Sequence, residues 1–113
     1  MEEGIPCKPV EVSNKFKANR THIYNYSLDT FGYFQTERYL HKIAKALETL
    51  SCFYTYYPEC RHIPTKSHMY RNIILDAHLI IYRITDERIE VLDIVHSASS
   101  IRKIRDTRKI SLR

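Results

Sequence analysis

The stretch from Arg71 to Ser100 reads RNIILDAHLIIYRITDERIEVLDIVHSASS and contains three short apolar runs separated by polar residues. Short runs that are rich in β-branched residues and bounded by turn formers are typical of strands. The reversals fall at residues 76–77 and 85–87. We therefore predict an antiparallel meander. Its three strands are Arg71 to Leu75, His78 to Ile84, and Arg88 to Val95.

Two segments before this meander repeat apolar residues at helical spacing. The first spans Lys15 to Phe31, and Ser13 or Asn14 is suited to cap its start. The second spans Tyr33 to Leu50 and carries polar residues on its other face. Gly32 lies between them, where a left-handed conformation would end the first helix, so the pair predicts a helical hairpin. The apolar positions are Phe16, Ile23, Tyr24 and Phe31, then Leu40, Ile43, Ala44, Leu47 and Leu50.

Shorter elements complete the predicted fold. Val10 to Val12 alternates like a short first strand, and Arg61 to Ile63 is a candidate for another. After the meander, a short helix is predicted with Ile101 and Ile104 facing the sheet, capped by one of two serines, Ser99 or Ser100.

This order of elements predicts the α+β class. The architecture is a short N-terminal strand, a helical hairpin, and then a three- to four-stranded antiparallel sheet with a short C-terminal helix. Residues 1–9 are predicted to be a flexible tail, and residues 10–113 a single domain.

Alternation along the strands predicts which side chains meet the helices. In the second strand, His78, Ile80, Tyr82 and Ile84 face one way, and Leu79, Ile81 and Arg83 the other. Both faces are largely apolar, so this strand is predicted to be covered on both sides. In the third strand we expect the side with Leu92 and Ile94 to meet the helices. Asp93 is a candidate partner for Arg83 if both side chains face the same side of the sheet.

The composition limits the classes of partner. Eighteen Lys and Arg against thirteen Asp and Glu give a net charge of +5, a field that favours nucleic acid or an acidic protein segment. The alternative is a generic basic surface, which would give the same net charge. Cys7, Cys52 and Cys60 are an odd number without metal-ligand spacing, so we predict no disulfide framework, a surface thiol and a cytoplasmic location. Neither a signal peptide nor a membrane-spanning run is expected.

Several of these residues together resemble the RelE/ParE superfamily of bacterial toxins. The segment THIYNYSLDTFG is similar to the first-helix pattern of that family, and Arg71 stands where the family often opens its hairpin. HLIIYRITDERIEVLDIVH resembles the family hairpin, with Tyr82 and Arg83 late in one strand and His96 ending the next. The resemblance covers Val10 to Ile104. It implies the toxin of a type II toxin–antitoxin module, associated with plasmid stabilisation and growth inhibition.

The superfamily implies two mechanisms. RelE-like members cut mRNA on the ribosome with basic residues around the scissile phosphate, but this chain has Leu79 and Ala98 near the positions of two family arginines. ParE-like members block DNA gyrase by binding, and their hairpin matches His78 to Arg83 better, although Ser97 to Ser100 departs from their pattern. The resemblance therefore favours the ParE-like subgroup. A degenerate, non-toxic antitoxin-binding module is a further alternative.

The two mechanisms predict different site residues. If the chain is an endoribonuclease, the predicted catalytic group is Lys66, His68, Arg71 and His96, provided that these four surround one phosphate. Solvated loop histidines, and a capped strand-end histidine at position 96, are the simpler interpretations. If the chain acts by binding, the target- or nucleic-acid-binding residues are Arg83, Arg102, Lys103 and Arg105. A solvated helix face is the simpler interpretation of the last three.

The resemblance also implies the partners. A cognate antitoxin is expected to lay a helix, and sometimes a strand, over the sheet and the helical hairpin. Gyrase, or the ribosome with its mRNA, is the expected target. We predict no cofactor, no metal and no membrane partner.

Overall fold

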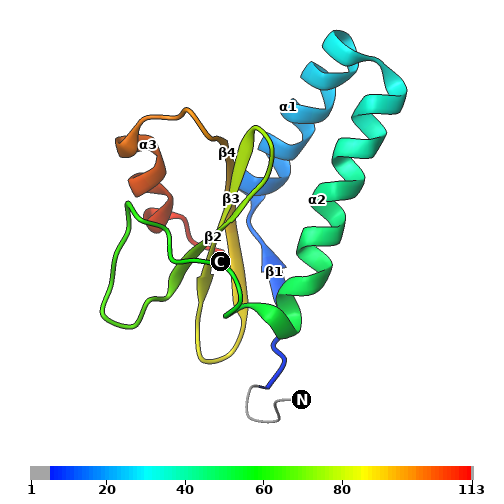
Figure 1. The fold of residues 1–113 in the computed structure, drawn as a ribbon. Coiled ribbons are helices and arrows are strands. Elements are labelled where there is room, and N and C mark those ends of the chain that lie inside the picture. Colours follow the sequence, from blue (N-terminus) through cyan, green and yellow to red (C-terminus); the bar gives the residue numbers. More distant parts are fainter. Residues whose placement is uncertain (1–5, 113) are drawn as a thin grey trace.

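The structure, a computed structural model, describes residues 6–112. A four-stranded sheet in the order β1-β4-β3-β2 has a helical hairpin on one face and a short helix on the other (Figure 1). The elements are β1 (Val10–Val12), α1 (Asn14–Phe31), α2 (Tyr33–Phe53), β2 (Tyr70–Ile74), β3 (His78–Ile84), β4 (Ile89–His96), α3 (Ile101–Asp106) and the 3₁₀ turn η1 (Thr107–Lys109). The predicted α+β class and element order are confirmed.

The sheet is mixed, which corrects the prediction that it is antiparallel throughout. β1 pairs in parallel with β4, with Val10 opposite Ile89 and Val12 opposite Val91. The helical hairpin explains this direction, because α1 leads the chain away from β1 and α2 returns it to the end where β1 began. β2 therefore runs the same way as β1, and two antiparallel turns later β4 runs that way too.

The helix boundaries agree closely with the predicted ones. Ser13 caps α1, since its hydroxyl oxygen accepts a hydrogen bond of 2.9 Å from the Phe16 N–H. Gly32 joins the helices with φ +87° and ψ 174°, so the positive φ is confirmed but the backbone is extended rather than left-handed helical. α2 continues three residues beyond Leu50, to Phe53.

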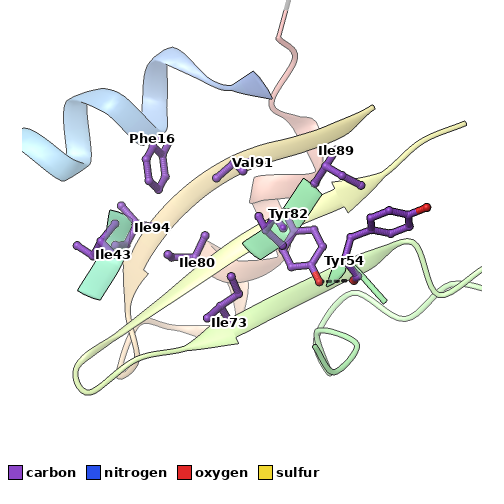
Figure 2. Packing of buried hydrophobic residues seen from close by; sticks show 10 residues of the cluster. Phe16, Ile43, Tyr54, Ile73, Ile80, Tyr82, Ile89, Val91 and Ile94 are labelled. Atoms are coloured by element: carbon purple, nitrogen blue, oxygen red, sulfur yellow. Dashed lines mark hydrogen bonds between the residues drawn. The ribbon is translucent and has the colours of Figure 1, made fainter. Parts of the chain in front are cut away.

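The main core lies between the sheet and the helical hairpin. Phe16 of α1 and Ile43 of α2 pack on Ile80 and Ile94, and all four side chains are buried (Figure 2). The Tyr82 hydroxyl donates to the backbone carbonyl of Tyr54, which ties the sheet to the end of α2. The predicted facing of β3 is confirmed. Phe31 and Ala44, predicted on the apolar helix faces, are exposed.

A second core fills the opposite face of the sheet, under α3 and the loop that precedes β2. A bulge in β4 leaves Leu92 without a partner on β3, because Val91 pairs with Tyr82 and Asp93 with Ile81. The bulge shifts the alternation, so Ile94 faces the hairpin as predicted but Leu92 faces α3. The members of this second core are Cys60, Ile63, Ile81, Leu92, Val95 and Ile104.

Two predictions about the edges of this second core are wrong. Ile101 is 50% exposed, because the short α3 turns only Ile104 toward the sheet. Arg61 to Ile63 forms a turn and no strand, although its Ile63 side chain is buried.

The cysteines differ from the prediction. Cys7 and Cys52 form a disulfide, and Cys60 is a buried free thiol rather than a surface one. Of the predicted flexible tail, residues 1–5 lie outside the described part of the chain. The rest of it, Pro6 to Pro9, is fastened to the end of α2, where Lys8 and Ser51 exchange hydrogen bonds. No helix in the described part of the chain is long and apolar enough to cross a membrane.

Candidate functional site

A groove of about 670 Å³ lies between the helical hairpin and the end of the sheet that carries the β2–β3 turn. Ile23 and Tyr26 of α1, Tyr39 of α2, and Phe31 near the tip of the hairpin supply its apolar wall. The Tyr26 and Phe31 rings are in edge contact, with centroids 6.5 Å apart, and are 67% and 53% exposed. Its other lining residues include His22, Arg38, Lys42, Asp76, His78 and His96.

Two histidines lie side by side at the floor of this groove. His78 begins β3 and pairs with His96 at the end of β4, and their ring centroids are 5.5 Å apart. The Tyr39 hydroxyl lies 2.7 Å from Nδ1 of His78. Nδ1 of His96 accepts a hydrogen bond of 3.0 Å from the Ala98 N–H. Burial, and secondarily the charge of His96, lower the pKa of His78, which favours its neutral form.

Three of the four candidate catalytic residues lie near the opposite end of β3. Nδ1 of His68 is 3.0 Å from the carboxylate of Glu59, and that hydrogen bond is the main cause of the lowered pKa of Glu59. Arg71 donates to the carbonyls of Tyr57 and His68, so its guanidinium braces the loop. Lys66 is exposed in the same loop.

His96, the fourth candidate, is remote from these three. Arg71 pairs with Tyr82 of β3, whereas His96 pairs with His78, four residues away along the same strand. That register puts Arg71 and His96 about 13 Å apart along the sheet and about 10 Å apart across it. The four residues therefore do not surround one phosphate as the nuclease hypothesis requires.

Arg83 is held inside the structure. Its Nη2 lies 2.7 Å from the carboxylate of Glu90, and both side chains are largely buried. It also donates to the carbonyls of Arg108 and Ile110, at 3.3 and 3.1 Å. The predicted partner was wrong, since Asp93 instead accepts a 2.6 Å hydrogen bond from Asn19. The register explains the difference, because Glu90 stands opposite Arg83 whereas Asp93 stands opposite Ile81, two residues away along β3.

The electrostatics of this cluster favour the ionised carboxylate. Burial alone would raise the pKa of Glu90, but hydrogen bonds from Arg83 and Arg88 outweigh burial and lower that pKa. Arg83 therefore anchors the segment that follows α3. It affects the exposed surface of that segment only indirectly.

The cations after β4 form the second exposed feature, which we call the α3 face. Ser100 caps α3 by accepting from the Lys103 N–H at 3.1 Å, and the buried Ile104 fixes the helix on the sheet. This attachment turns five cationic side chains outward. Lys15 of α1 lies near two of them, Arg102 and Lys103. The α3 face consists of Arg102, Lys103, Arg105, Arg108 and Lys109.

The sequence reasoning missed the partners of His96. Counting pairs from the turn at residues 85–88 places His78 opposite Val95, and only the bulge at Leu92 brings it to His96. Tyr39 carried no signal of its own in the sequence. Within residues 6–112, no cluster of three His, Cys, Asp or Glu side chains is arranged to hold a metal ion.

Comparison with known protein families matches residues 10–101 to the ParE toxin of the type II toxin–antitoxin system parDE. The chain belongs to this family. Among solved structures, one described as the chromosomal ParDE TA system from P. aeruginosa superposes with a TM-score of 0.65 at 15% sequence identity. The match covers 80% of this chain and 96% of that chain, and at this identity it shows a shared fold. No curated protein matches the sequence.

Proposed function

We propose that this member of the ParE family arrests growth by binding DNA gyrase, and that a cognate antitoxin neutralises it. The observation that carries this proposal is the family match across residues 10–101. Membership of a toxin–antitoxin family implies an antitoxin partner. To the family assignment we add two proposals: that gyrase is the target, and that the antitoxin neutralises the toxin.

The separation of the nuclease candidates supports a mechanism without covalent chemistry. Cleavage of RNA needs a general base, a general acid and cations around one phosphate. Here His96 is at one end of the sheet, and Arg71 is at the other, engaged by backbone carbonyls. A toxin that acts by binding needs no such constellation.

We assign the target contact to the α3 face. Arg102, Lys103 and Arg105 are exposed on a helix whose position is fixed by the Ser100 cap and Ile104. Clustered cations suit an acidic protein surface or the backbone of the DNA that gyrase holds. Arg83 serves this contact by holding the carbonyls of residues 108 and 110, rather than by touching the target.

We assign the groove beneath the helical hairpin to the antitoxin. Its exposed aromatic wall, with Tyr26 and Phe31, suits the apolar face of an amphipathic segment. The groove and the α3 face are separate. An antitoxin seated in the groove would therefore shield the target contact either with a further segment or by steric bulk.

Controlled expression without an antitoxin tests the proposal. We expect growth arrest with damaged or unsegregated chromosomes, intact transcripts, and rescue by the acidic protein of an adjacent reading frame. Codon-positioned mRNA cleavage would instead support the ribosome-dependent endonuclease. Normal growth, with the protein folded and able to bind that partner, would support the degenerate binding module.

A further inference from the structure

We propose that His78 and His96 together hold a carboxylate of the segment that fills the groove, so that this segment binds more tightly as the pH falls. The inference rests on the proposed role of the groove as the antitoxin site. It adds the chemistry of the contact and a dependence on pH.

The orientation of the two imidazoles leaves the same atom free on each. Nδ1 of His78 is occupied by the Tyr39 hydroxyl, and Nδ1 of His96 by the Ala98 N–H. Among residues 6–112, no hydrogen bond reaches Nε2 of either ring, although both rings line the groove. Because Nδ1 of His96 accepts from the Ala98 N–H, that ring carries its proton on Nε2, and His78 does the same when its Nδ1 accepts from the Tyr39 hydroxyl. The two rings then offer paired donors to one ligand.

The surrounding charges favour an anion at this position. His22 faces it from α1, and Arg38 and Lys42 face it from α2. Asp76 is the acidic residue of the lining, and its carboxylate is already paired with Lys42 at 3.0 Å. Tyr39 keeps its proton because burial raises the pKa of its hydroxyl. A carboxylate that enters the groove therefore meets cations and donors without an unpaired carboxylate among the lining residues.

His78 can take up a proton and keep its contact with Tyr39. When it is charged, its Nδ1–H can donate to the Tyr39 oxygen, so the contact survives protonation. The His78 and His96 rings are 5.5 Å apart, close enough to contact the same ligand.

The direction of the pH effect follows from linkage. Burial keeps His78 neutral in the free protein by lowering its pKa. A bound carboxylate stabilises the charged form and raises that pKa, so binding is accompanied by proton uptake. Affinity is therefore greatest at low pH, and the gain is lost as the pH rises through the pKa that His78 has in the complex.

Two matched peptides test this inference on the full chain. Each is a fluorescein-labelled amphipathic peptide of about fifteen residues with leucines at helical spacing. One carries glutamates beside the leucines, and the other carries glutamines at those positions. Fluorescence anisotropy gives Kd for each peptide between about pH 8 and about pH 6, where imidazole titrates and glutamate stays ionised.

We expect Kd of the glutamate peptide to fall about tenfold over this range, as one added charged hydrogen bond would give. Kd of the glutamine peptide should stay constant. His78→Asn keeps an acceptor for Tyr39 but cannot take up the proton, so it should reduce the pH dependence. His96→Asn keeps an acceptor for Ala98 and should weaken binding of the glutamate peptide. His41→Asn, on the exposed part of α2, is the control and should behave like the parent chain.

An unchanged pH dependence in His78→Asn would overturn the inference. Equal behaviour of the two peptides would overturn it as well, as would the absence of binding by the glutamate peptide near pH 6. None of these results bears on growth arrest or on gyrase, so the toxin proposal fails or stands by its own experiment.

Discussion

Arg83 and Glu90 lie opposite each other on β3 and β4, with Nη2 of the guanidinium 2.7 Å from the carboxylate. The pair is largely shielded from solvent on the face of the sheet that α3 covers. Because Arg83 also donates to two carbonyls after α3, this one ion pair links the strand hairpin to the C-terminal segment. The position of the α3 face therefore depends on a contact inside the molecule.

Removing one member of this pair should destabilise the fold. Arg83→Met leaves the Glu90 carboxylate partly buried with only Arg88 beside it, and we expect a loss of about 3 kcal/mol in the free energy of unfolding. Urea denaturation measures the loss. The double variant Arg83→Met/Glu90→Leu should recover most of it because no buried charge is left. A loss under about 1 kcal/mol in the single variant would show that the pair contributes little.

The same carboxylate should make stability depend on pH. The pKa of Glu90 is lowered in the folded protein, so its contribution is fully present above the ordinary glutamate pKa of about 4.3. The contribution is lost as the pH falls through the lower, folded-state pKa. Thermal unfolding between about pH 7 and pH 3 should show this decline, and Glu90→Gln should show a shallower one. Parallel curves for the two proteins would assign the decline to other carboxylates.

Charge reversal on the α3 face should abolish toxicity and spare the fold. Arg102→Glu/Arg105→Glu changes two exposed side chains, so the free energy of unfolding should change by less than about 0.5 kcal/mol. Growth arrest on induction should disappear. Lys17→Glu/Lys45→Glu, at exposed positions on α1 and α2, changes the net charge equally and should stay toxic. Loss of toxicity in both pairs would point to overall charge rather than to this face.

The disulfide gives a direct chemical test of the structure. In unfolding buffer without reductant, a thiol reagent should label one cysteine, Cys60, because Cys7 and Cys52 are joined. After reduction the same reagent should label three. Cys7→Ser/Cys52→Ser should lower the free energy of unfolding by about 3 kcal/mol relative to the oxidised protein. Three labelled cysteines before reduction would show that the pair is not bonded in the purified protein.

Local patterns in the sequence were sufficient to predict most of the elements. The three strands of the meander and the two long helices were predicted within a few residues, because turn formers and helical spacing are properties of neighbouring residues. The Ser13 cap was predictable for the same reason, because capping depends on neighbouring residues. The family resemblance rested on these segments, and the family match confirms it over residues 10–101.

The features that local patterns missed depend on contacts between distant residues. The parallel pairing of β1 with β4 follows from the whole helical hairpin, and the bulge at Leu92 arises where β4 packs between two cores. Cys7 meets Cys52 because Lys8 and Ser51 are hydrogen-bonded across 43 residues of sequence. Spacing along the chain signalled neither contact, and the pairing of His78 with His96 depended on the bulge.

A supercoiling assay with purified gyrase and relaxed plasmid tests whether this chain stops growth by binding gyrase. Added parent protein should inhibit supercoiling in proportion to its concentration, and Arg102→Glu/Arg105→Glu should not inhibit. Full gyrase activity in the presence of folded parent protein would rule out gyrase as the target. Cleavage of mRNA on purified ribosomes by the same preparation would instead support the nuclease mechanism.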